Sequence, residues 1–77
     1  MKKFKIAVTN MGGIHQVGFQ AIKGDFAPDA TVFSTRAAAC AAAQGMADWN
    51  SQFDDQRGFA ALVCTKRGTR WIVISQH

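Results

Sequence analysis

"FAALVCTKRGTRWIVIS", residues 59–75, is the stretch that decides the fold. Two apolar runs rich in β-branched residues flank a single glycine, which indicates two antiparallel strands joined by a tight turn. A two-residue turn at Arg67-Gly68 places Lys66 opposite Thr69 and Cys64 opposite Trp71. The sequence therefore predicts a hairpin at this end of the chain.

Both faces of this hairpin are apolar, because successive side chains of a strand point to opposite sides. One face carries Phe59, Ala61, Val63, Arg70, Ile72 and Ile74. The other carries Ala60, Leu62, Cys64, Lys66, Trp71 and Val73. We expect a helix on the first face. The second face, with Leu62, Cys64 and Trp71, is then open to a partner unless residues 23–33 fold across it, and one β-bulge would exchange the two faces.

The N-terminal part of the chain predicts two more strands. Phe4, Ile6 and Val8 alternate with polar residues, the period of a half-buried strand. "NMGG", residues 10–13, supplies turn residues, and a second alternating run covers about residues 14–22. We expect these two strands to pair with each other as a hairpin.

A helix is predicted over "TRAAACAAAQGMADW", residues 35–49, because alanine is the strongest helix former. Ser34 or Thr35 is expected to cap it, and Gly45 to kink it or end it early. Residues 23–33, with the only proline, form a connecting loop. The expected buried stripe, at three- and four-residue spacing, is Ala38, Ala42, Met46, Trp49 and Phe53.

These elements predict an α+β fold in which one helix packs on one face of an antiparallel four-stranded sheet, in the order strand, strand, helix, strand, strand. The 77 residues form a single domain, residues 1–77. Two cysteines are too few for a disulfide-stabilised secreted domain, and no stretch has the length or apolar character of a leader or a membrane span. We expect a cytoplasmic protein with reduced thiols.

Charge favours an acidic partner. Nine Lys and Arg residues against five Asp give a net charge of +4, which excludes a strongly acidic mimic of DNA. Three of the cations stand on the turn of residues 64–75, beside a tryptophan and near the lysines of the first strand. Arginine binds carboxylates and phosphates through paired hydrogen bonds, and Trp with Arg is enriched at binding hot spots. The candidate partner-binding residues are Lys3, Lys5, Lys66, Arg67, Arg70 and Trp71. The alternative is that these cations only solubilise an exposed turn.

No catalytic or metal-binding pattern is evident. Cys40 and Cys64 lack metal-ligand spacing and are expected to be small buried apolar residues, while His77 is expected to be mobile. Asp54-Asp55 stands in a polar loop without a nucleophile, and "NMGG" lacks the lysine that follows a phosphate-binding loop. We predict a protein that is not an enzyme and has no cofactor or metal.

The whole chain resembles the small anti-CRISPR proteins of phages and prophages, especially inhibitors of type I surveillance complexes. The residues that carry this resemblance are the start "MKKFKIAV", the helix "STRAAACAAAQGM" and the hairpin "ALVCTKRGTRWIVIS", with "KRGTRW" at its turn. The resemblance implies a protein that binds a Cas subunit, in the cytoplasm of a bacterial host, and blocks target DNA binding.

Other functions stay open. "TVFSTRAAACAAAQGM" also resembles the small antitoxin fold of the HicB type, although acidic helix residues and a C-terminal DNA-binding segment are missing. The same cations would serve a nucleic-acid-binding module, and an open apolar face would serve a homodimer.

Overall fold

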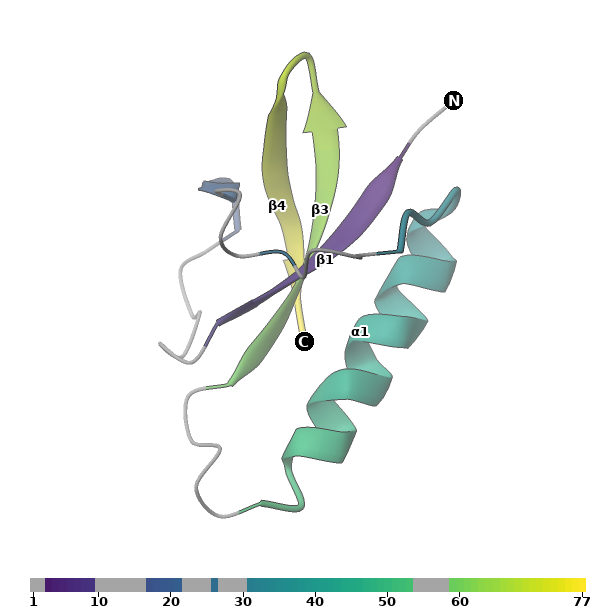
Figure 1. The fold of residues 1–77 in the computed structure, drawn as a ribbon, viewed down its shortest axis with the longest axis vertical. Coiled ribbons are helices and arrows are strands. Elements are labelled where there is room, and N and C mark those ends of the chain that lie inside the picture. The colour runs from purple at the N-terminus through teal and green to yellow at the C-terminus, as the bar shows by residue number, and fades with distance from the viewer. Residues whose placement is uncertain (1–2, 10–16, 22–25, 27–30, 54–58) are drawn as a thin grey trace.

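The computed structural model describes residues 3–9, 17–21, 26, 31–53 and 59–77, which form one helix and four antiparallel strands (Figure 1). The elements are β1 (Phe4–Thr9), β2 (Gln20–Ala21), α1 (Arg36–Asn50), β3 (Ala60–Arg67) and β4 (Arg70–Gln76). The sheet order is β1-β3-β4-β2. The α+β class is confirmed. Of the predicted strand 14–22 the structure describes residues 17–21, and the predicted turn 10–13 lies outside the described residues.

The two N-terminal strands do not form the expected hairpin. β1 pairs with β3, from Phe4↔Thr65 to Thr9↔Ala60, whereas β2 pairs with β4, so that β1 and β2 lie on opposite edges of the sheet. The prediction was wrong because β3 and β4 are apolar on both faces and therefore take the central positions. A lysine-bearing strand and a two-residue strand suit the edges, where charge and short length discourage pairing with another chain.

The turn of the β3–β4 hairpin is Gly68–Thr69, one residue later than predicted. Gly68 has a φ of 63°, and no other residue type has a positive φ among the described residues. A positive φ at the first central residue alone is the pattern of a type II′ turn, which favours glycine there. Cys64 is consequently opposite Val73 and not Trp71. Moving the turn by one residue shifts the register by two, so every side chain keeps its predicted face.

A β-bulge interrupts the pairing of β3 with β4. The register shifts between Val63 and Cys64, and Ile74 is the additional residue on β4. Ile74 packs on the helix side of the sheet, and the hydroxyl of the next residue, Ser75, lies 3.6 Å from the sulfur of Cys40 on the helix. The bulge does not exchange the faces, because both residues turn toward α1.

Helix α1 begins as the capping residues predict. Thr35 is the N-cap, and its hydroxyl accepts a hydrogen bond from the backbone N–H of Ala38 at 3.2 Å. The helix runs on through Gly45 to Asn50, so the expected early end is not observed.

The helix presents a different stripe to the sheet than predicted. Ala39 and Ala43 are fully buried, whereas Trp49 is 62% exposed and Phe53 is 46% exposed, with their rings packed edge to face on each other. Alanine side chains let the helix lie close on the sheet, and bulky side chains at this contact would push the two apart. The predicted stripe was therefore wrong at Ala38, Met46, Trp49 and Phe53, all exposed, and Ala42 is only half-buried.

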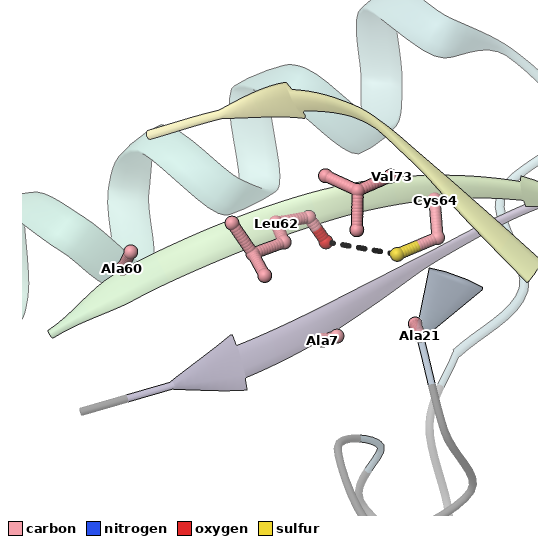
Figure 2. Close-up of a cluster of buried hydrophobic side chains, with 6 residues drawn as sticks. All are labelled: Ala7, Ala21, Ala60, Leu62, Cys64 and Val73. Atoms are coloured by element: carbon pink, nitrogen blue, oxygen red, sulfur yellow. Dashed lines mark hydrogen bonds between the residues drawn. The ribbon is translucent and has the colours of Figure 1, made fainter. Parts of the chain in front are cut away.

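The core has two parts, one on each face of the sheet. The cluster between α1 and the sheet consists of Phe4, Ala39, Ala43, Ala61 and Val63, with Phe59 and Ile74 packed against it. The predicted helix face is thereby confirmed. The second cluster consists of Ala7, Ala21, Ala60, Leu62, Cys64 and Val73; Figure 2 shows it with the helix behind the strands.

The second face is not open, contrary to our prediction. Leu62 is 4% exposed and Cys64 is fully buried, while Trp71 is half-buried. Phe26, from the segment that connects β2 to the helix, packs against this cluster and meets the Trp71 ring edge-on at 5.8 Å between centroids. The covering segment that the sequence left as an alternative is therefore observed at Phe26.

The end of β4 is tied to the helix and to β3, so His77 is not mobile as predicted. The His77 N–H donates to the Ala61 carbonyl at 2.8 Å. The ring Nδ1 lies 3.2 Å from the Gln44 side-chain oxygen, and Nε2 lies 3.0 Å from the Ser75 hydroxyl. Because an amide oxygen only accepts, Nδ1 donates to Gln44, and the contact of Nε2 with the Ser75 hydroxyl holds the ring against β4. The Gln44 amide in turn donates to Asp48 at 3.0 Å.

Replacement of Leu62 by alanine tests the covered second face. Removing a buried leucine side chain costs roughly 2–5 kcal/mol of unfolding free energy. Trp49→Ala, at an exposed position, is expected to cost less than about 1 kcal/mol although it removes more atoms. Urea unfolding curves of both variants would measure this difference. Equal losses, or a larger loss for Trp49→Ala, would contradict the assignment of the two faces.

Candidate functional site

The tip of the β3–β4 hairpin carries two arginines that face each other. Arg67 is directly opposite Arg70 across the turn, and both are exposed. Like charges directly opposite each other in a sheet destabilise the pair. Neither guanidinium has an ion pair among the described residues. A partner that brings a carboxylate or phosphate to this tip would relieve the repulsion.

Trp71 follows Arg70 on β4, at the base of the hairpin tip. Its cross-strand neighbour is Lys66, and the Lys5 ammonium lies 5.1 Å from the centre of its ring. The same ammonium lies 5.7 Å from the ring of Phe26. Such cation–π contacts contribute about 0.5–1 kcal/mol at exposed sites. Trp71 therefore holds Lys5 in place over the second core cluster, and its ring is already occupied within the chain.

The start of β1 brings a second lysine beside the hairpin. Phe4 is opposite Thr65, and the Thr65 hydroxyl donates to the carbonyl of Lys3 at 3.2 Å. Continuing this register places Lys3 beside Lys66. All six predicted binding residues therefore lie on or just before the adjacent strands β1, β3 and β4, but on both faces of the sheet. Lys3, Lys5, Lys66 and Trp71 are on the face of the second cluster, and Arg67 and Arg70 are on the other.

One cation at this end was missed by the sequence analysis. Arg36, the first residue of α1, lines the same cavity as Lys66 and Arg67 of β3. The local sequence does not predict that Arg36 lies near β3, because this proximity depends on where the helix begins relative to the sheet. The only signal was the cap at Thr35, which fixes Arg36 in the first turn.

Among the described residues, the positive and negative side chains lie at different ends of the molecule. The described cations stand at the starts of β1 and α1 and on the hairpin: Lys3, Lys5, Arg36, Lys66, Arg67 and Arg70. Asp48 is the one carboxylate side chain of the described residues, in the last turns of α1. Asp48 is twelve positions further along the helix than Arg36, about 18 Å at 1.5 Å per residue. In Figure 1 the hairpin tip and the end of α1 lie at opposite ends of the long axis.

The cysteines occupy different environments. Cys64 is buried in the second cluster, as predicted, whereas Cys40 is only half-buried and packs on the helix side. Neither forms a disulfide with a described residue, and the sheet lies between their clusters. The described residues contain no group of three or more side chains placed to hold a metal ion.

Comparison with models of protein families, with curated protein sequences and with solved structures found no match for this chain. In the part of the chain that the structure describes, no helix has the length and apolar character needed to cross a membrane.

Substitution of Lys5 tests the contact between its ammonium and the Trp71 ring. Lys5→Met keeps an apolar stem but removes the ammonium, so it is expected to lower the unfolding free energy by about 0.5–1 kcal/mol. It should also change the fluorescence of Trp71, measured in a Trp49→Phe background. Lys3→Met, at an exposed position, is the control and should change neither property. An effect of equal size in the control would contradict the contact.

Proposed function

We propose that this protein is a binding protein that does not catalyse a reaction. It docks its basic hairpin end on an acidic surface of a partner and thereby obstructs that surface. The observation that supports the proposal is the gathering of six cations from three parts of the chain at one end, away from the described carboxylate. Neither the sheet nor the helix needs to change for this end to be reached, because its arginine side chains are exposed.

Arg67 and Arg70 supply the specific contacts in this proposal. Each guanidinium offers a planar set of donors that fits a carboxylate through two parallel hydrogen bonds. These two arginines repel each other in the free protein. Docked anionic groups reduce this repulsion, which makes the binding free energy more favourable. Lys3 and Lys66 contribute mainly to the rate of encounter, because charges at a rim steer association.

The partner proposed is a Cas subunit of a type I surveillance complex, in the cytoplasm of a bacterial host. This chain resembles the small anti-CRISPR proteins in size, in the order of its elements and in the "KRGTRW" turn, and that resemblance supports the proposal. An inhibitor whose basic hairpin end is bound to an acidic surface of the Cas subunit would exclude target DNA from the complex. No cofactor or metal enters this mechanism.

A second candidate function is nucleic-acid binding, as in a HicB-like regulator, because the clustered cations would also suit phosphates. Trp71 is less suited to stack on bases, since Lys5 and Phe26 already contact its ring. Salt separates the two functions: phosphate contacts lose roughly 0.9 log unit of affinity per contact for each log unit of salt. Binding to an immobilised oligonucleotide at three salt concentrations measures this slope.

Charge reversal at the tip tests the proposed function. Arg67→Glu with Arg70→Glu is expected to abolish inhibition of target DNA binding by type I complexes, measured by gel shift, and phage protection measured by plaque counts. Thermal unfolding should stay nearly unchanged, because both side chains are exposed.

The matched control is Arg67→Lys with Arg70→Lys, which keeps the charge and removes only the planar fork. Partial inhibition by this control would assign the effect to both charge and geometry. Full inhibition by the double glutamate variant would overturn the proposal, since the tip would then be only a solubilising surface.

A further inference from the structure

A cavity of about 500 Å³ lies between the start of α1 and strand β3. We propose, resting on the proposed function, that this cavity binds the carboxylate of a glutamate side chain from an acidic segment of the protein partner. The proposal identifies one contact point behind the hairpin tip and adds Arg36 to the residues that make it.

The rim of the cavity is cationic. Arg36 from the helix and Arg67 from the sheet line it, and no carboxylate of the described residues does. Lys66 also borders the cavity, but its side chain belongs to the opposite face of the sheet, where it is the cross-strand neighbour of Trp71. Arg36 and Arg67 are 31 positions apart in the sequence, so the fold alone brings these charges together. The two like charges beside one space repel each other, and an anion between them would offset that repulsion.

The floor of the cavity is apolar. Phe4 and Ile74 contribute to its lining, and Ile74 is half-buried, so that part of its surface remains available. Thr65 also lines the cavity, but its hydroxyl already donates to the Lys3 carbonyl. The donors left for an anion therefore come from Arg36 and Arg67, together with the hydroxyl of Ser34, which also lines the cavity.

The two walls are held in place before any ligand arrives. Phe33 and Phe4 exchange two backbone hydrogen bonds, with N–O distances of 2.9 and 2.8 Å, which fasten the chain just before the helix to the edge of β1. Thr35 then caps the first turn through Ala38. A site whose walls are already fixed loses less entropy on binding than one that must assemble.

The combination favours a glutamate side chain over a nucleic-acid phosphate. Two methylene groups can lie on the apolar floor while the carboxylate meets the cations at the rim. A single-stranded nucleic acid is instead held by a groove that follows its backbone and by aromatic rings that stack on bases, and Trp71 is occupied within the chain.

Binding of a fluorescein-labelled decaglutamate peptide, measured by anisotropy in 150 mM salt, tests the site. Arg36→Gln and Arg67→Gln are each expected to weaken binding at least tenfold. Gln52→Glu is the matched control, because it lowers the net charge by the same amount at an exposed position after the end of α1, outside the lining of the cavity. It should weaken binding less than about threefold.

Equal losses in all three variants would overturn the proposal, since they would indicate general charge attraction. Tighter binding of a labelled ten-nucleotide DNA with the same dependence on Arg36 would also overturn it, in favour of phosphate. Loss of peptide binding in all variants counts against the cavity only if their melting curves match the parent.

The failures of the two proposals are distinguishable. If Arg36→Gln retains peptide binding while the double glutamate variant loses inhibition, the cavity assignment fails and the proposed function stands. If no type I complex responds to the parent protein but Arg36 controls peptide binding, the cavity stands and the proposed target fails.

Discussion

The rest of the structure depends on one strand that is buried on both faces. Five consecutive residues of β3, Ala60 to Cys64, are buried, with Ala61 and Val63 toward the helix and the alternate residues toward the second cluster. Such a strand requires a neighbour on each edge and a cover on each face. β1 and β4 supply the edges, α1 one cover, and Phe26 with Trp71 part of the other. A domain of this size has few other sources of stability.

The same strand connects the core to the candidate binding surface. After Cys64 the burial of β3 ends, and Lys66 and Arg67 continue it into solvent beside the turn. Because the core fixes this strand, the two cations are held at defined positions relative to Arg36 and Lys5. The apolar face that would have suited a homodimer is closed within one chain. Recognition by charge at the hairpin end is thus better supported than recognition by an apolar sheet.

Sequence patterns predicted those features that depend on local chemistry. Thr35 caps the helix, glycine makes the hairpin turn, and alternation in β3 and β4 assigns both faces correctly.

Features set by tertiary contacts were missed. A run of alanines carries little contrast between Ala38 and Ala39, so the buried stripe was misplaced and Trp49 was expected inside. Strand pairing was inferred from adjacency in sequence, which holds for only about two-thirds of neighbouring strands. Arg36 becomes part of a site only when the sheet is placed beside it.

Thiol accessibility of Cys64 tests the central claim most directly, because this side chain lies in the second cluster and is fully buried. In a Cys40→Ser variant at low micromolar concentration, Cys64 is the single thiol available to a colourless disulfide reagent that releases a chromophore. A face covered within one chain predicts labelling at the rate of global unfolding, accelerated by mild urea. Labelling in native buffer as fast as that of the fully unfolded chain would contradict it and return the sheet face to solvent.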